Sequence, residues 1–430
     1  MVDGGRGHGE RSAGGERRDR KRLGAVVLAV LISQVLLYPG VPSLTVALGA
    51  PAGIDAGMWF LVAEFAAFVA FAVVWGAVSD ALGRRIPLIV IGAFGGALAY
   101  VSLALIPVIG AGFEAALVVR AVGGAFTVGA FSLSITTLMD LRGGNGRNMG
   151  VAGLAIGLGA AVGSVGGGVL ADLGVFYPIY AGAGVLVLSG VLASTVSDTP
   201  ARTGDIPGGD RATEARSPRA RGVREALARV RAVPALLVPC AFGFIDRLTA
   251  GFFSLVGVFY FQDPATFGLS ATGAGATLAL FFIPFALLQA PFGAISDRIG
   301  RFYPIIGGSL AYGVAIIGVG LAPVYPVAAG LMVLVGVCGA LLAPATMALV
   351  TDIIDPEARG AAMALFNVFG SLGFLTGFLV GGAATGAFGY RPAFLVVGGL
   401  ELLIALALLP IVRAIVSEDG SPRWGIPDRS

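Results

Sequence analysis

Twelve apolar runs, each long enough to cross a membrane, follow one another along this chain. A transmembrane helix needs about 20 mostly apolar residues to cross the hydrocarbon core of a bilayer. Charged residues, or glycine and proline breaks, separate each run from the next. We therefore predict an all-α polytopic membrane protein with twelve transmembrane helices. The predicted spans are residues 23–48, 57–79, 86–109, 115–138, 149–171, 175–197, 233–261, 271–295, 303–322, 326–351, 360–384 and 391–413.

Scarce residue types exclude several kinds of chemistry. Charged residues make up 12% of the chain and hydrophobic residues 57%, so the polar side chains are too few to cover a soluble enzyme. His8 and Lys21, the one histidine and the one lysine, lie in a polar N-terminal segment. A histidine-ligated metal site, a Walker phosphate loop and a lysine Schiff base are therefore not available. Cys240 and Cys338 lie in apolar runs and should be free and buried. We expect no enzymatic activity, no metal and no cofactor.

Polar segments divide the chain into two sets of six spans. Within the central segment, Val223, Leu227 and Val230 follow helical spacing beside arginines, which is typical of an amphipathic helix on a membrane surface. An ordinary solvated linker explains that segment equally well. The predicted parts are a disordered cytoplasmic tail (1–22), an N-terminal six-helix bundle (23–197), a cytoplasmic linker (198–232), a C-terminal six-helix bundle (233–413) and a second cytoplasmic tail (414–430).

The basic residues predict the orientation of the chain in the membrane. With the N-terminus inside, 25 of the 28 Arg and Lys residues fall in inner segments, and the outer loops hold only Arg391. Arg120 and Arg247 lie within spans. Cytoplasmic loops carry an excess of Lys and Arg. We therefore expect both termini to be cytoplasmic, and we place the chain in the cytoplasmic membrane of a prokaryotic cell.

Three short motifs recur in the two halves at nearly constant spacing, each at the same place in its half. Because six spans separate the copies, both halves cross the membrane in the same sense. This is a parallel repeat, which predicts a substrate path between the halves. The repeated pairs are residues 76–84 and 293–301, Asp140 with Arg147 and Asp352 with Arg359, and the glycines at 159–168 and 373–382.

The loop motif after the second span resembles the signature G-x-x-x-D-[RK]-x-G-[RK]-[RK] of the major facilitator superfamily of secondary transporters. Two positions depart from it: Ala81 replaces a basic residue in the first copy, and Phe302 replaces the last basic residue in the second. The resemblance extends over roughly residues 23–413, and the motifs are closest to those of the twelve-span drug/proton antiporter branch. The matching residues are Gly76, Asp80, Gly83, Arg84 and Arg85, and then Gly293, Asp297, Arg298, Gly300 and Arg301.

The resemblance implies a cytoplasmic gate. In the family, the acidic and basic residues of this loop pair with charges after the fourth span and hold the outward-facing state. Asp140 and Arg147 fit that partner role by position, as do Asp352 and Arg359 in the second half. The alternative is a plain charged loop that only obeys the positive-inside rule.

Arg120 in the fourth span and Glu64 in the second are the leading candidates for proton coupling. An arginine within hydrocarbon costs about 2.5–3.5 kcal/mol on insertion scales, so it should face a partner or water. The run Arg120-x-x-Gly123-Gly124 resembles the span-four motif of the family, in which the arginine is implicated in proton coupling. Glu64 lies at a similar depth, and we hypothesise a pair in which protonation of Glu64 releases Arg120. Alternatively, Arg120 extends to the outer interface and Glu64 is hydrated at the rim.

Further polar residues within spans are candidates for the substrate cavity. Asp246 and Arg247 lie midway along the seventh span, where ionisable groups indicate substrate contact or proton carriage, or else a structural ion pair. Gln34 and Tyr38 in the first span are candidate lining groups. Glu401 lies midway along the twelfth span, where a structural bond to a neighbouring helix is the default interpretation.

Glycines in the fifth span resemble the antiporter signature of the family, with Ser164 in place of its proline. Small residues let helix backbones approach closely, and we expect this to happen where the halves meet. Generic packing is the alternative in a chain with 68 glycines. The signature favours export by proton exchange. The residues are Gly150, Gly159, Gly163, Gly167 and Gly168.

Together these features predict a secondary transporter that works by alternating access. The leading mechanism is proton-coupled efflux of small amphipathic or apolar compounds, and 27 phenylalanines are consistent with an apolar cavity. Uptake of a sugar or organic acid and a non-transporting membrane sensor are the alternatives. We expect a small-molecule substrate, protons and the lipid bilayer as partners, no nucleic acid, and a functional monomer.

Overall fold

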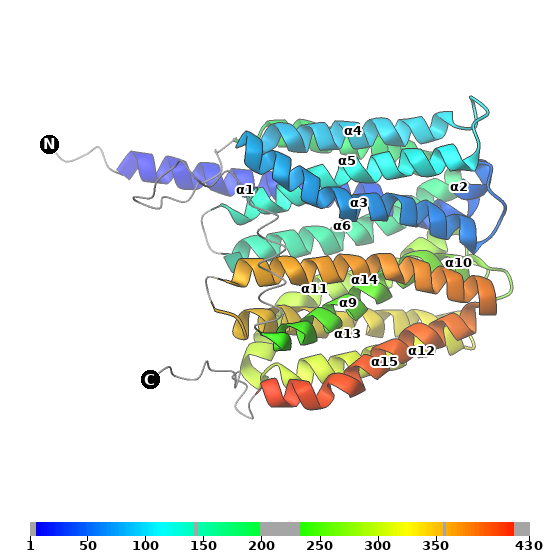
Figure 1. Ribbon diagram of the computed structural model, residues 1–430. Coiled ribbons are helices and arrows are strands. Elements are labelled where there is room, and N and C mark those ends of the chain that lie inside the picture. The colour runs from blue at the N-terminus through cyan, green and yellow to red at the C-terminus, as the bar shows by residue number, and fades with distance from the viewer. Residues whose placement is uncertain (1–5, 142–144, 198–232, 356–357, 417–430) are drawn as a thin grey trace. The chain divides into compact units, whose positions relative to one another are not determined.

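The computed structural model describes residues 6–141, 145–197, 233–355 and 358–416, apart from the side chains of residues 6–13 and 145–147 (Figure 1). Within these ranges, twelve helices are long and apolar enough to cross a membrane. Each of them overlaps one predicted span, so the predicted all-α fold with twelve transmembrane helices is confirmed.

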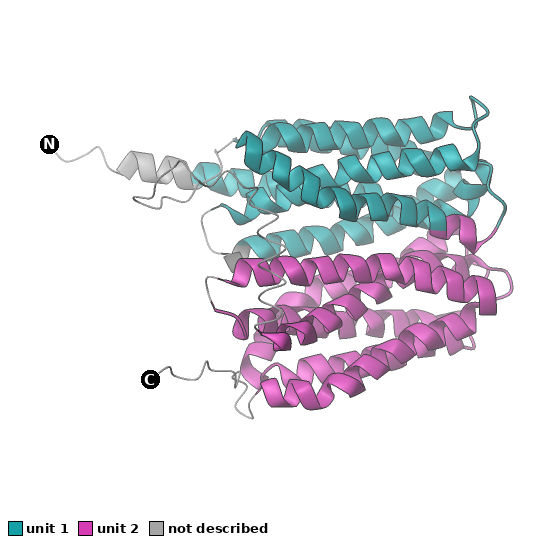
Figure 2. Cartoon of the chain, in the orientation of Figure 1, with its two compact units in different colours: residues 1–52, 59–210 teal, residues 53–58, 211–430 magenta. Residues whose placement is uncertain are grey.

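The chain forms two compact units (Figure 2). Unit 1 comprises residues 1–52 and 59–210, and unit 2 comprises residues 53–58 and 211–430. The boundary at Asp210 falls within the segment predicted as the linker. The helices of unit 1 are α1 (Arg6–Val35), η1 (Tyr38–Gly40), α2 (Val41–Ala47), α3 (Ile54–Leu82, whose first turn belongs to unit 2), α4 (Ile86–Leu105), α5 (Phe113–Met139), α6 (Asn145–Leu173) and α7 (Tyr177–Ser194).

Unit 2 repeats this arrangement with two local changes. A π-helical turn, η3, interrupts the seventh span, and another, η4, begins the ninth. Such turns are rare and occur frequently at functional sites. Its helices are η2 (Pro234–Leu236), α9 (Leu237–Phe252), η3 (Phe253–Gly257), α10 (Val258–Gln262), α11 (Ala271–Ile299), η4 (Tyr303–Gly307), α12 (Gly308–Leu321), α13 (Tyr325–Asp352), α14 (Arg359–Phe388) and α15 (Tyr390–Ile415).

The same helix pairings occur in both units. In unit 1, α1 packs against α6, and α4 packs against α5 and α7. In unit 2, α9 packs against α14, and α12 packs against α13 and α15. The first span of each half thus contacts the fifth, and the third contacts the fourth and sixth. The sequence repeat is therefore also a packing repeat.

Glycines with positive φ end corresponding helices in the two units. Gly83 follows α3 with φ of 63°, and Gly300 follows α11 with φ of 84°. Other residues rarely adopt this backbone conformation. Both copies of the loop motif therefore turn at a glycine.

Large apolar side chains cover much of the outer surface. Leu98, Leu188, Val314 and Leu403 are each more than 60% exposed. In water such a surface would be unfavourable, but in a bilayer it contacts lipid.

The expected disorder of the N-terminal tail is wrong for residues 14–22, because they belong to α1. Arg20 donates a hydrogen bond to Asn148 Oδ1 at 2.7 Å, and Arg22 donates to the carbonyl oxygen of Thr195 at 2.6 Å. These contacts hold the middle of α1 to α6 and to the end of α7. The linker 198–232, with its amphipathic segment, and residues 417–430 lie outside the described residues.

Candidate functional site

Glu64 on α3 and Arg120 on α5 form an ion pair inside unit 1. A glycine makes the pairing sterically feasible. A Cβ atom at Gly124, one turn after Arg120, would overlap the backbone carbonyl oxygen of Glu64. The absence of a side chain at Gly124 therefore lets α5 approach α3 at the level of the pair. The structure brings together the two residues that the sequence analysis paired.

The pair is buried among aromatic rings. Glu64 is 4% exposed and Arg120 is 1% exposed, so Arg120 does not extend to an interface and Glu64 is not at a hydrated rim. The guanidinium carbon of Arg120 lies 4.5 Å from the ring centre of Phe60 and 5.6 Å from that of Tyr100. A desolvated guanidinium over an aromatic face gains about 2 kcal/mol. These rings partly replace the hydration that Arg120 loses.

Neither aromatic partner was predicted from the sequence, although one signal was present. Phe60 precedes Glu64 by one helical turn, so both side chains lie on the same face of α3. Tyr100 comes from α4, and its hydroxyl donates to the carbonyl oxygen of Ser33 at 3.0 Å. No local pattern connects Tyr100 with Arg120.

Three polar atoms of the pair have no hydrogen-bond partner among the described residues. They are Glu64 Oε1, Arg120 Nε and Arg120 Nη1. A fully satisfied buried ion pair uses most of its donors and acceptors. This pair therefore retains hydrogen-bonding capacity for a further ligand.

The two candidate lining residues of the first span are buried near the pair. Gln34 Nε2 donates to Thr127 Oγ1 at 3.5 Å, and Tyr38 interacts electrostatically with Glu64 and Arg120. Thr127 and Ser134, which follow Arg120 on one face of α5, are fully buried. In this structure these two side chains pack within the protein.

Asp246 and Arg247 in α9 point to different environments. Asp246 is 4% exposed, whereas the side chain of Arg247 is 45% exposed. Asp246 Oδ2 lies 3.7 Å from Arg247 Nε. Thr249 and Phe253, which follow Asp246 on its face, are fully buried. This face of α9 packs inside the protein in this structure.

Glu401 on α15 has the bond to a neighbouring helix that the sequence analysis took as its default. The hydroxyl of Ser309 on α12 donates to Glu401 Oε1, and Glu401 is fully buried. Tyr312, one turn after Ser309, is buried as well and interacts electrostatically with Glu401 and Asp246. Neither Ser309 nor Tyr312 stood out in the sequence. Cys338 interacts with Glu401, and both Cys338 and Cys240 are free and buried, as predicted.

The two copies of the loop motif form ion pairs through different positions. In unit 1, Arg85 pairs with Asp140. In unit 2, Phe302 occupies the position equivalent to Arg85, and Arg301 donates to Asp352 at 2.9 Å and to Asp297 at 2.6 Å. Arg301 thus takes over the contact that the substituted residue cannot make.

The environment of Arg301 favours its charged form. Partial burial by itself lowers the pKa of Arg301, but hydrogen bonds to Asp352 and Asp297 outweigh that effect, so the pKa lies above its ordinary value. Arg301 Nη1 also donates to Ser296 at 3.1 Å.

The other predicted gate residues make fewer contacts within their own units. Arg359 donates to the carbonyl oxygen of Thr351 at 3.1 Å. The side chain of Arg147 lies outside the described residues. A Cβ atom at Gly293 would lie 3.5 Å from Pro344, an ordinary contact, so close helix approach does not depend on this glycine. Asp80, Arg84 and Arg298 are exposed, and Gly76 is buried.

The glycines of the antiporter-like motif pack α6 against α1 within unit 1. A Cβ atom at Gly159 would lie 2.9 Å from the carbonyl oxygen of Leu28, one at Gly163 would lie 3.0 Å from that of Ile32, and one at Gly167 would overlap that of Leu36. The expected location, where the halves meet, is corrected: this packing surface is internal to one unit. A Cβ atom at Gly150 would meet nothing within 4 Å, and Gly168 is buried.

The second copy of the glycine motif has the same function in unit 2. Cβ atoms at Gly373 and Gly377 would overlap the carbonyl oxygens of Phe244 and Leu248 on α9. The two glycine motifs therefore build equivalent helix contacts, α1 with α6 and α9 with α14. The physical reason is the backbone approach that only glycine permits.

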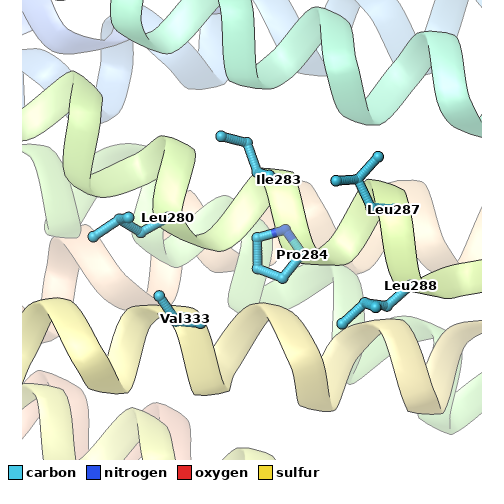
Figure 3. A pocket seen from close by; sticks show the side chains of 6 residues that line it. All are labelled: Leu280, Ile283, Pro284, Leu287, Leu288 and Val333. Atoms are coloured by element: carbon cyan, nitrogen blue, oxygen red, sulfur yellow. The ribbon is translucent and has the colours of Figure 1, made fainter.

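An apolar pocket of about 380 Å³ lies between α11 and α13 in unit 2 (Figure 3). No polar or charged side chain lines it. The pocket is open, because Ile283, Leu287 and Val333 are exposed, and it offers no side chain for hydrogen bonding. The lining residues are Leu280, Ile283, Pro284, Leu287, Leu288 and Val333.

The sequence of this chain is similar to those of known transporters. The sequence profile of the Major Facilitator Superfamily matches residues 23–263 and 247–427. The multidrug efflux pump LfrA of Mycolicibacterium smegmatis is 31% identical over 147 residues, 34% of this chain and 28% of that protein. The multidrug resistance protein MdtG of Enterobacter lignolyticus is 30% identical over 172 residues, 39% of this chain and 41% of that protein. The chain spans less than half the length of either relative in these alignments.

Solved structures show a similar fold at low sequence identity. A bacterial homolog to the human lysosomal transporter Spinster, in an inward-facing and occupied conformation, matches with a TM-score of 0.74. The match covers 94% of this chain and 98% of that chain at 15% identity.

Proposed function

The chain belongs to the major facilitator superfamily, and from this premise we propose that it exports small amphipathic or apolar compounds in exchange for protons. As a member of this family it is a multi-pass membrane protein and a secondary transporter. Proton coupling, the direction of transport and the class of substrate are the proposed parts.

The buried Glu64–Arg120 pair carries the proposal for proton coupling. A carboxylate can be neutralised by a proton, whereas a guanidinium stays charged in proteins. Protonation of Glu64 removes the negative partner and leaves Arg120 with the ring of Phe60 and with the ring and hydroxyl of Tyr100, none of which carries a negative charge. A buried charge without a partner is costly, so Arg120 then favours a conformation in which it meets water or another acceptor. Protonation thereby favours a conformational change of unit 1.

Three observations support export of an amphipathic or apolar compound. The names of LfrA and MdtG describe multidrug efflux and multidrug resistance. The pocket between α11 and α13 is lined by apolar side chains alone. The glycine motif of α6 resembles the antiporter signature, with Ser164 in place of its proline.

Transport in proteoliposomes tests proton exchange and its dependence on Glu64. The purified chain is reconstituted with a pH-sensitive dye inside the vesicles, and a panel of amphipathic dyes that includes ethidium is offered as substrate. We expect protons to move opposite to the dye. Glu64→Gln keeps a hydrogen-bond acceptor for Arg120 but binds no proton. Exchange of dye for dye across the membrane should therefore persist, while the proton movement coupled to dye transport is lost.

Glu114→Gln is the matched control, because Glu114 is an exposed carboxylate in the first turn of α5. It should retain wild-type coupling. Unchanged proton stoichiometry in Glu64→Gln would refute the role of Glu64. Protons moving in the same direction as the dye would refute exchange, and the absence of flux for every dye would refute this class of substrate.

We also propose that the ion pairs of the loop motif act as a cytoplasmic gate. Arg301→Gln removes the contacts with Asp352 and Asp297, of which Asp297 is largely exposed. Exposed pairs contribute about 0–1 kcal/mol, so the melting temperature should hardly change. The rate of dye transport should fall, because the gate no longer holds one of the two states.

A second substitution makes this test specific. Adding Phe302→Arg to Arg301→Gln restores a basic residue at the position that pairs in unit 1, and it should recover the rate. Arg413→Gln, an exposed arginine at the end of α15, is the control and should leave the rate unchanged. A rate that does not respond to Arg301→Gln contradicts the gate.

The orientation in the membrane belongs to the same proposal. The distribution of 25 basic residues over the predicted inner segments supports cytoplasmic termini in a prokaryotic cell membrane. We also propose that the monomer is the functional form. A reporter protein that is active only in the cytoplasm should therefore be active when it is fused to either terminus.

A further inference from the structure

Glu401 is a carboxyl group buried midway along α15 without a cation beside it. The side chain is fully buried. Ser309 donates to one carboxyl oxygen, and the other, Oε2, has no hydrogen-bond partner among the described residues. One hydroxyl is a weak counterpart for a full negative charge, because an isolated buried carboxylate is far less stable than a paired one.

The helices around Glu401 bring acidic and neutral groups to this place. From α12 come Ser309 and Tyr312, and from α13 comes Cys338, which interacts electrostatically with Glu401. From α9 comes Asp246, whose negative charge also acts on Glu401. These are the groups for which an interaction with Glu401 is found within the described part of unit 2.

The cations on these helices serve other groups or lie far away. Arg247 Nε lies 3.7 Å from Asp246, and the Arg247 side chain is 45% exposed. Arg359, on α14, donates to the backbone at the end of α13. Arg391 and Arg413, on α15 itself, are 10 and 12 residues from Glu401, which is about 15–18 Å along a helix. Because the charge of Arg247 balances that of Asp246, the negative charge of an ionised Glu401 would have no cation in the described part of the chain to balance it.

Within the part of the chain that the structure describes, the hydroxyl of Tyr312 is a second unpaired polar group in this neighbourhood. It is fully buried and has no hydrogen-bond partner among the described residues. It interacts electrostatically with the carboxyl groups of both Asp246 and Glu401. Buried polar groups are normally paired. Oε2 of Glu401 lacks a hydrogen-bond partner in the described residues, and a proton on the carboxyl group removes the charge that this oxygen would otherwise share.

We propose that Glu401 is a proton-binding residue of unit 2, separate from Glu64. Its carboxyl group carries a proton in this conformation, and the Ser309 hydroxyl donates to the carbonyl oxygen of the neutral acid. The proton removes the uncompensated charge and makes Glu401 compatible with its burial. The site stands on the interior of unit 2 alone and does not depend on proton coupling at Glu64.

Infrared spectroscopy of the full chain in lipid tests this directly, because a protonated carboxyl has a carbonyl stretching band that a carboxylate lacks. We expect the wild-type protein at neutral pH to show such a band, and Glu401→Gln to lose that component. Glu64→Gln and Asp246→Asn should retain it. A carboxyl band unchanged by Glu401→Gln would overturn the proposal.

Ser309→Ala provides a second infrared test in which Glu401 itself is unchanged. Loss of the hydrogen bond should shift the same band to higher frequency while its intensity is retained. Ser254→Ala is the matched control, because Ser254 is equally buried but donates to the backbone oxygen of Ala250. No shift in Ser309→Ala would also overturn the proposal, even if Glu401→Gln failed to fold. Since neither spectrum requires transport, failure here is distinguishable from failure of the proposed efflux.

Discussion

Replacing Glu64 by leucine is expected to destabilise unit 1 by about 3–5 kcal/mol, the usual cost of removing one partner from a buried ion pair. Arg120 would keep its charge and would have only Phe60 and Tyr100 against it. Arg120→Met is expected to cost less, because the remaining Glu64 can be neutralised by a proton. Thermal unfolding followed by tryptophan fluorescence measures the effect.

Trp75 is a suitable local probe. Its indole nitrogen donates to the carbonyl oxygen of Ala125 on α5 at 2.6 Å, five residues from Arg120. The double variant, Glu64→Leu with Arg120→Met, should be more stable than Glu64→Leu, since two apolar side chains often replace a buried pair without loss. If the loss of stability in the double variant equalled the sum of the losses in the two single variants, the two residues would not be coupled.

Alanine at the closest glycine contacts is expected to lower stability strongly. A Cβ atom at Gly167 would overlap the carbonyl oxygen of Leu36, and one at Gly373 would overlap that of Phe244. Backbone atoms cannot rotate away as a flexible side chain can, so α6 or α14 must shift. Overpacking of this kind costs about 1–3 kcal/mol or more. We expect a lower melting temperature and less folded protein in the membrane for each variant.

Matched glycines in the same helices provide the controls. Gly150 in α6 and Gly360 in α14 have nothing within 4 Å of an added Cβ atom. Alanine at either position should leave the melting temperature unchanged or raise it slightly, because alanine is the better helix former. For unit 2, a thiol-reactive dye can report unfolding through the buried Cys240 and Cys338. Equal melting temperatures for Gly373→Ala and Gly360→Ala would contradict the importance of the close approach.

Much of the candidate site was predictable because rare residue types stand out in an apolar chain. Glu64 and Arg120 attract attention as the two charges of similar depth in the first half, and the structure pairs them. Phe60 and Tyr100 were not predictable in the same way, since aromatic residues are common throughout the spans. The ion pair of Arg301 with Asp352, formed where Phe302 replaces the usual arginine, was also not predictable. It depends on how far the Arg301 side chain extends across a turn.

The choice between Asp246 and Arg247 shows the same limit. Adjacent residues on a helix point about 100° apart, so the sequence states that they diverge but not which one is inside. The structure buries Asp246 and exposes Arg247. The same holds for Glu401. The sequence placed it midway along a span, but it did not show that Ser309 and Tyr312 of another helix lie beside it.

The sequence by itself determined the twelve spans, their expected orientation and the two-fold repeat. The length of an apolar run, the sign of the charges at its ends and a repeated motif are local properties that can be read along the chain. Only the tertiary structure decided which face of each helix turns inward, and hence which side chains meet. Helices that are apolar on all sides carry no periodic pattern to indicate that face. The rotation of each helix is therefore decided by packing, through glycine contacts such as the one that brings Glu64 to Arg120.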